Sequence, residues 1–164
     1  MSSEFVNIYK AFPEGYRAVS ELERVVAASP LDHATFELVK LRASQLNGCA
    51  YCIDMHHKDA RAAGETEERL YMLAAWREAT VYTESERAAL ALTEAVTRLA
   101  DRPDPVPDEI WDEAARHYDE RQLGALVLSI ASINVWNRLN AATRQVTGEW
   151  IDQLIHVEPD RQAA

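Results

Sequence analysis

The stretch "LGALVLSIASINVWNRLNAAT", residues 123–143, is the part of the sequence that decides the fold class. It is apolar on nearly every side, with only serines and asparagines interrupting it before Arg138. A helix that is apolar all round is buried rather than lying on a surface. Its length is near that of a membrane span, but the polar residues and Arg138 within it favour a central bundle helix or a subunit interface. We therefore expect a central bundle helix or a helix at a subunit interface, without a membrane partner.

Apolar residues also recur at helical spacing upstream of this stretch. Pro13 can begin a helix, and Asp32 is a good N-cap for the next one. The dipeptide of Asn47 and Gly48 interrupts that second helix, and Gly64 is a C-cap position for a third. The three helices expected from these signals cover residues 14–27, 32–46 and 49–63.

Shorter helical patterns follow, each opening on a residue type that caps helix N-termini. The strongest signal is a capping box of Thr83 and Glu86. The run "DRPDPVPDE", residues 101–109, is rich in proline and must connect two helices. The helices expected here cover residues 66–76, 83–101 and 108–119, with Thr66, Thr83 and Asp108 as their caps.

No segment alternates like a strand or contains a hairpin dipeptide between β-branched runs. We therefore predict an all-α, single-domain helical bundle of about six to seven helices over residues 1–164, with its core region at 31–147. A chain of 164 residues suits one domain. In the tail after Gly148, Trp150 is expected to anchor part of the chain.

The charge and composition exclude several classes of protein. A formal net charge of −10 makes DNA and RNA unlikely partners, because phosphate binding calls for a basic patch. The N-terminal residues have no basic segment followed by an apolar one, so we expect no export. The chain has two cysteines, too few for a disulfide framework, and their spacing is typical of redox or metal chemistry in a reducing compartment. The cytoplasm fits best.

Both cysteines lie in "NGCAYCIDMHH", residues 47–57. On a helix, Cys49 and Cys52 are neighbours and His56 stands one turn beyond Cys52. The Cα atoms of Cys49 and Cys52 would be about 5 Å apart, which permits a disulfide without unfolding the helix. The free N–H groups of a first helical turn stabilise a thiolate, so at least one cysteine should be reactive near neutral pH. These residues therefore favour redox chemistry.

Two other interpretations of the cysteine pair remain open. Cys49, Cys52 and His56 could supply three of the four tetrahedral ligands of Zn²⁺, with Glu37 or His57 as the fourth. Ligands drawn mostly from one helical turn fit a closed site poorly. Alternatively, the cysteines are buried small residues that pack as hydrophobes.

A carboxylate on the preceding helix completes the cluster. Glu37 lies about 15 Å back from the turn at Asn47, and His56 lies about 10 Å past Cys49. If the two helices form an antiparallel hairpin, Glu37 and His56 stand at similar heights. A carboxylate beside an imidazole fixes its tautomer and raises its basicity. Glu37, His56 and Cys52 could then form a proton relay.

The pattern E-x11-C-x2-C-x3-H, filled by Glu37, Cys49, Cys52 and His56, resembles the active-site pattern of AhpD-like alkylhydroperoxidases in the carboxymuconolactone decarboxylase superfamily. The likeness extends over residues 38–97, and "INVWNRLNAATR", residues 133–144, is similar to the closing helix of that group.

This resemblance implies an all-helical fold, a trimeric or hexameric homo-oligomer, and a thiol peroxidase that needs neither a cofactor nor a metal. It implies that Glu37 and His56 are the relay, Cys52 attacks a hydroperoxide, and Cys49 resolves the product into a disulfide. A dithiol reductant would then restore the thiols. The decarboxylase branch does not use a CxxC pair, so the resemblance argues against lactone decarboxylation.

The sequence departs from the better-known members of the group at Tyr51. Those members have a histidine just before the second cysteine, so one branch of the proton relay is absent here or replaced by a phenol. A competing function is a non-enzymatic redox or stress sensor, in which the same disulfide changes assembly or partner binding. Such a sensor would react with about one equivalent of oxidant, whereas an enzyme would turn over many.

Overall fold

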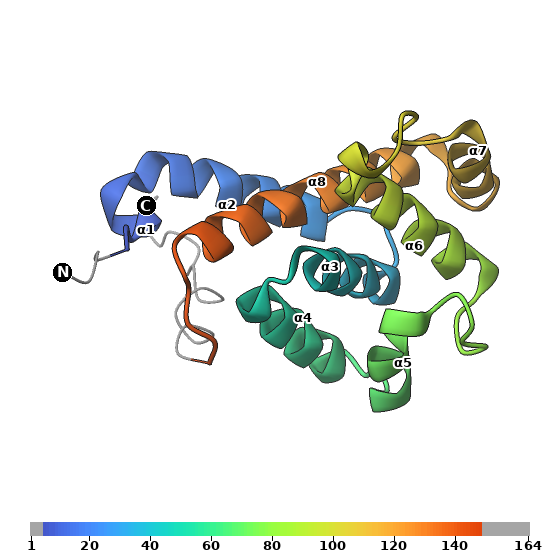
Figure 1. The fold of residues 1–164 in the computed structure, drawn as a ribbon, viewed down its shortest axis with the longest axis horizontal. Coiled ribbons are helices and arrows are strands. Elements are labelled where there is room, and N and C mark those ends of the chain that lie inside the picture. The colour runs from blue at the N-terminus through green and yellow to red at the C-terminus, as the bar shows by residue number, and fades with distance from the viewer. Residues whose placement is uncertain (1–4, 149–164) are drawn as a thin grey trace, which may run out of the picture.

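A computed structural model describes residues 5–148 of the chain, and all regular secondary structure in that range is helical (Figure 1). This confirms the all-α prediction. Trp150, the expected anchor of the tail, lies outside the described residues. The elements are α1 Ile8–Ala11, α2 Pro13–Ala27, α3 His33–Asn47, α4 Ala50–Ala62, α5 Glu67–Met72, the 3₁₀ turn η1 Leu73–Ala75, α6 Glu84–Thr97, the 3₁₀ turn η2 Leu99–Asp101, α7 Asp108–His117 and α8 Glu120–Ala142.

Residues 5–148 contain eight α-helices rather than the six to seven expected. The additional helix is α1, whose four residues are too few for a periodic pattern; Asn7 caps it by accepting the N–H of Lys10 at 3.1 Å. The helix expected to begin after an Asp108 cap has Pro107 as its N-cap instead. Helix α8 begins three residues earlier than expected, after a capping box of Asp119 and Gln122 that the apolar pattern did not include.

Helix α3 is the centre of the arrangement and packs against α4, α6 and α8 (Figure 1). Its side chains Leu38, Val39 and Leu41 are almost completely buried. Full burial of a leucine or valine side chain stabilises a fold by about 1.5–3 kcal/mol. Helix α2 lies along α8 on the other side of the molecule from α5. A functional group on α3 is therefore held on a rigid element.

Helix α8 is buried on one face rather than all round, which corrects the expectation for residues 123–143. Leu126, Ile130 and Ile133 are fully buried. Leu128 is 47% exposed and Val135 37% exposed. Because apolar residues also lie on that side, the sequence predicted a helix buried all round. In residues 5–148, no element covers that side. Within residues 5–148, no helix has both the length and the hydropathy of a membrane span.

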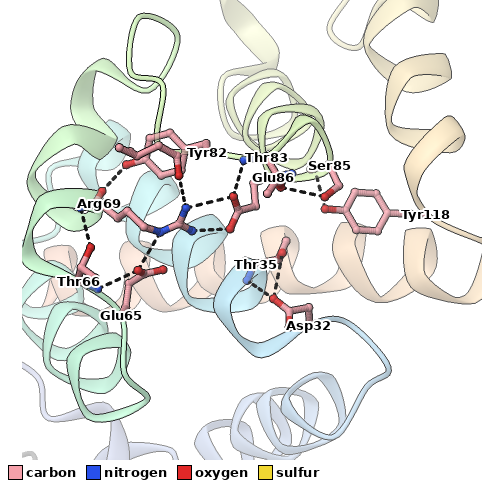
Figure 2. Close-up of polar contacts among 11 residues, drawn as sticks. Asp32, Thr35, Glu65, Thr66, Arg69, Tyr82, Thr83, Ser85, Glu86 and Tyr118 are labelled. Carbon is pink, nitrogen blue, oxygen red and sulfur yellow. Dashed lines mark hydrogen bonds and ion pairs between the residues drawn. The ribbon is translucent and has the colours of Figure 1, made fainter.

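Arg69 holds α5 against the start of α6, as Figure 2 shows. Its guanidinium bonds to Glu65 at 2.8 Å and also to Glu86 and the carbonyl of Val81. Burial lowers the pKa of Arg69, but the two carboxylates outweigh it and leave that pKa above its usual value. Glu86 also completes the predicted capping box of α6 by accepting the N–H of Thr83 at 2.7 Å. These contacts fix the wall of a pocket discussed below.

Candidate active site

The turn between α3 and α4 brings the site residues together. Gly48 adopts the left-handed conformation with a φ of 66°, which costs glycine nothing, and ends α3. The N–H of Cys49 bonds back to the carbonyl of Ser44 at 3.0 Å. Helix α4 then returns along α3. As a result, Glu37 on α3 meets His56 on α4 although 19 positions separate them.

Cys49 and Cys52 form a disulfide, with their Cα atoms 5.4 Å apart. Cys49 is the N-cap of α4 rather than a residue of its first turn, and its Sγ accepts the N–H of Cys52 at 3.3 Å. Both cysteines are buried. An unpaired N–H at a helix start is the type of donor that stabilises a thiolate. The local structure therefore permits both the dithiol and the disulfide state without unfolding α4.

Glu37 and His56 form a buried pair. His56 Nδ1 lies 2.9 Å from Glu37 Oε2, and each residue is 5% exposed. A carboxylate at Nδ1 holds the proton on that nitrogen and leaves Nε2 as the acceptor. An imidazole in this tautomer can receive a proton from a thiol.

Asn140 on α8 is a site residue that the sequence analysis did not identify. Its side-chain amide donates to Cys52 Sγ at 3.4 Å. Two further asparagines of α8 and Asn47 tie this helix to the end of α3: Asn47 donates to Asn137 at 2.8 Å and to Asn134 at 3.0 Å. Polar residues at one-turn intervals in an otherwise apolar helix were the available signal. Their partners lie about 90 positions away and could not be read from spacing.

A second buried charge pair lies beside the first and was also missed. Lys40 is 0% exposed and pairs with Glu23 of α2, which also accepts the hydroxyl of Ser132 at 2.6 Å. Burial raises the pKa of Glu23, but Lys40, the Ser132 hydroxyl and His56 together outweigh it and leave that pKa below its usual value. A buried charge survives only when paired in this way. The carboxylate of Glu23 therefore stays ionised.

Asp59, on α4, lies close to both Glu37 and His56. Burial raises the pKa of Asp59, and so does the neighbouring Glu37 carboxylate. His56, His33 and Lys40 act in the opposite direction but do not cancel these effects. The site thus brings two carboxylates together around one imidazole.

Tyr51 occupies the position between the cysteines where the sequence departs from the family pattern. It is 5% exposed, and its hydroxyl is the one buried side-chain polar atom in residues 5–148 without a hydrogen-bond partner. Burial raises the pKa of Tyr51, with smaller contributions from nearby carboxylates. The phenol is therefore a neutral donor at neutral pH and not a base. Trp136 packs in the same cluster as Tyr51 and the cysteines, and Tyr16 contacts Trp136 edge-on at 5.3 Å.

His57 points away from the site, where it pairs with Glu67 at 3.3 Å and is part exposed. In the disulfide state, the sulfurs of Cys49 and Cys52 are bonded to each other and offer no thiolate to Zn²⁺. The described side chains whose ligand atoms do converge are Glu37, His56 and Asp59, which lie within 4.8 Å of one another.

Comparison with known proteins places this arrangement in a family. The model of the carboxymuconolactone decarboxylase family matches residues 13–95, a range that includes the CxxC pair, Glu37 and His56. The chain is 46% identical over 140 residues to the uncharacterized protein YdfG of Bacillus subtilis, covering 85% of this chain and 94% of that one. It is 37% identical over 71 residues to the alkyl hydroperoxide reductase AhpD of Bradyrhizobium diazoefficiens, covering 39% of each chain.

Solved structures agree with the sequence relatives. The fold is similar, with a TM-score of 0.85 and 38% identity, to an Agrobacterium tumefaciens protein of unknown function, for which a role as the antioxidant defence protein AhpD has been suggested. The similarity covers 90% of this chain and 99% of that chain. The extent of these matches and the helical architecture lead to one assignment: this chain belongs to the carboxymuconolactone decarboxylase family, as an AhpD-like member.

Proposed function

We propose that the protein is a thiol-dependent peroxidase that reduces organic hydroperoxides through a cycle between the Cys49–Cys52 dithiol and its disulfide. The observation that carries the proposal is the buried Glu37–His56 pair, at 2.9 Å, one helical turn from a CxxC disulfide. A base in contact with a carboxylate, next to two closely spaced thiols, provides what peroxide reduction needs.

In the first step, His56 accepts the proton of the Cys52 thiol, and the thiolate attacks the terminal oxygen of the hydroperoxide. The O–O bond breaks, the sulfur takes up that oxygen as a sulfenic acid, and the alkoxide leaves as an alcohol with the proton from His56. Glu37 stabilises the imidazolium that forms between the two transfers. The amide of Asn140, 3.4 Å from Cys52 Sγ, supports the sulfur while it is negative.

In the second step, the Cys49 thiol loses its proton and its sulfur attacks the sulfur of the sulfenic acid; the S–O bond breaks, a disulfide forms, and the hydroxide takes up that proton and leaves as water. An external dithiol then exchanges with the disulfide and becomes oxidised itself. The sum is one hydroperoxide and one dithiol converted to an alcohol, water and one oxidised dithiol. Such reductants are kept reduced in the cytoplasm, so the cycle would run there, in a homo-oligomer of three or six chains.

Relatives support this proposal in a specific way. The AhpD of Bradyrhizobium diazoefficiens is an alkyl hydroperoxide reductase by name, and the similar Agrobacterium tumefaciens structure has been linked to antioxidant defence.

The second candidate is a redox sensor, which the burial of both cysteines favours because burial limits access for an external reductant.

Steady-state consumption of cumene hydroperoxide in the presence of dithiothreitol tests the proposal and separates the two candidates. The enzyme should consume many equivalents per chain, and a Cys52→Ser variant should consume none above the uncatalysed rate. Consumption that stops after about one equivalent per chain would contradict catalysis and favour the sensor.

A further inference from the structure

A second carboxylate lies beside the Glu37–His56 pair and has no place in the peroxidase cycle. Asp59 follows His56 by three positions on α4, so both side chains lie on the face that packs against α3. The ligand atoms of Glu37, His56 and Asp59 all lie within 4.8 Å of one another. One imidazole and two carboxylates from two rigid helices therefore surround one point.

A pocket of about 420 Å³ adjoins this cluster at Glu37, which is the one member of the three that lines it. Glu37 and His33 line this pocket together with Ala60, Gly64, Glu65 and Arg69. His33 is exposed, and its Nε2 is 3.9 Å from Glu37 Oε1, the oxygen that does not bond to His56. The pocket therefore adds a second imidazole at the solvent side of the cluster.

The charges around the cluster are negative in sum. The ammonium of Lys40 pairs with the carboxylate of Glu23, so it does not neutralise Glu37 or Asp59. His56 contributes at most one positive charge against these two carboxylates. A divalent cation at the centre would balance the carboxylates and leave the imidazoles neutral, which is the form in which histidine binds metals.

We propose that Glu37, His56 and Asp59, with His33 from the pocket wall, bind one divalent first-row transition-metal ion such as Zn²⁺, and that the bound ion switches off the Glu37–His56 relay. Two imidazoles and two carboxylates make a donor set that suits zinc and its neighbours. The binding site stands without the peroxidase; the switch rests on the proposed function.

Metal binding requires movements of the ligand side chains. In a tetrahedral site with bonds of about 2.0–2.1 Å, ligand atoms are about 3.3–3.4 Å apart, so a separation near 4.8 Å must shorten by about 1.4 Å. The Nδ1 to Oε2 separation of 2.9 Å must lengthen slightly to admit the ion. Rotations of the Glu37 and Asp59 side chains are the movements that would bring the ligand atoms together.

An ion bound to Nδ1 would change what His56 can do. With Nδ1 metallated, the neutral imidazole carries its proton on Nε2 and has no free lone pair there. It can then donate a hydrogen bond but cannot accept the proton of a thiol. Metal binding would therefore stop thiolate formation without touching either cysteine.

The first test is a titration of metal-free protein that has been oxidised to the disulfide, so that the thiols are unavailable. Isothermal titration with Zn²⁺, and Co²⁺ absorption as a second readout, should give one ion per chain. Asp59→Asn and His33→Ala should each raise the dissociation constant for Zn²⁺ tenfold or more, and His57→Ala should leave it unchanged. Because His33 is exposed, His33→Ala should fold, and it tests the metal site even if Asp59→Asn fails to fold.

Equal affinity in His33→Ala, Asp59→Asn and the wild type would overturn the site, as would binding that appears only after the disulfide is reduced.

The second test measures a single turnover of hydroperoxide by pre-reduced protein without added dithiol. Saturating Zn²⁺ should slow the wild type and His57→Ala at least tenfold and slow His33→Ala less. Equal inhibition of His33→Ala would place the inhibiting ion on the thiols and overturn the switch.

The two tests also separate this proposal from the proposed function. Binding by the oxidised protein, together with no turnover in the absence of metal, would keep the metal site and remove the peroxidase and the switch. Turnover without any binding by the oxidised protein would keep the peroxidase and overturn the metal site.

Discussion

Glu37 can act on His56 because both side chains are held away from water, where a carboxylate–imidazole contact is least screened. The pair is joined through His56 Nδ1, so the second ring nitrogen is left for proton exchange. Asn140 acts on a different atom, the sulfur of Cys52. At the scale of single residues, the proposed base His56 and the proposed reactive thiol of Cys52 thus have separate neighbours, so their roles can be tested separately.

His56→Ala should slow both thiol alkylation and hydroperoxide reduction about a hundredfold or more, because the general base is lost. Glu37→Gln keeps the size of the side chain but not its charge, and should slow both about tenfold. His57→Ala, which changes a part-exposed histidine one position along, is the matched control and should react as the wild type. Stopped-flow kinetics checks the rates and circular dichroism the fold. An unchanged rate in His56→Ala would remove the imidazole from the mechanism.

Asn140→Asp should disfavour the Cys52 thiolate, because it places a negative charge close to the sulfur. The pH profile of alkylation by iodoacetamide should shift upward, and the rate at pH 7 should fall about tenfold. A profile identical to the wild type would mean that Asn140 has no influence on the reactive sulfur.

Among the elements, the α3–α4 hairpin shows how much could be predicted from the sequence. The break at Gly48 and the E-x11-C-x2-C-x3-H spacing predicted which side chains face each other, because both are set by local helix geometry. The contacts of Asn140 and Lys40 could not be predicted in this way. They depend on how α8 and α2 pack against α3, and their partners are 88 and 17 positions distant.

Helix α6 is joined to α3 by Glu94, which accepts from Arg42 at 2.9 Å and Trp76 at 2.8 Å and pairs with Arg77. Burial raises the pKa of Glu94, but these donors outweigh it, so the folded pKa lies below the ordinary 4.5. A lowered folded pKa means that the stabilisation is present above about pH 4.5 and is lost as the pH falls through the folded value. It should therefore be intact at neutral pH.

Glu94→Gln should reduce the free energy of unfolding by about 1–2 kcal/mol at pH 7, since hydrogen bonds to a charged group are lost. The difference from the wild type should shrink at a pH below about 4.5, as Glu94 of the wild type itself takes up protons. Urea unfolding at the two pH values measures this. Glu78→Gln, on an exposed residue nearby, serves as control and should differ little at either pH. A Glu94→Gln deficit that does not change with pH would contradict the assignment.

For the molecule as a whole, the uncovered face of α8 is the feature that remains to be explained. Leu128 and Val135 are exposed there, beside a pocket of about 530 Å³ lined by residues of α6, η2 and α8. Exposed apolar side chains in a row mark interfaces more often than free surface. The homo-oligomer expected from the family resemblance would use this face.

Native mass spectrometry and light scattering should therefore show a trimer or hexamer for the wild type. Leu128→Asp should shift the population to monomers, because an unpaired charge cannot be buried in an apolar interface. Tyr71→Asp, on an exposed side chain of α5, should leave the assembly intact. A wild-type protein that is monomeric at micromolar concentration would contradict the oligomer.

In the proposed cycle a hydroperoxide oxidises the Cys49–Cys52 pair, and Cys52 is the thiol that attacks the peroxide first. The most direct measurement is the intact mass of freshly reduced, metal-free protein before and after one equivalent of cumene hydroperoxide. The wild type should lose two hydrogen atoms and regain them with a dithiol, and Cys49→Ser should instead gain one oxygen on Cys52 that dimedone traps. An unchanged mass of the wild type, or a trapped oxygen in Cys52→Ser but not in Cys49→Ser, would contradict the account.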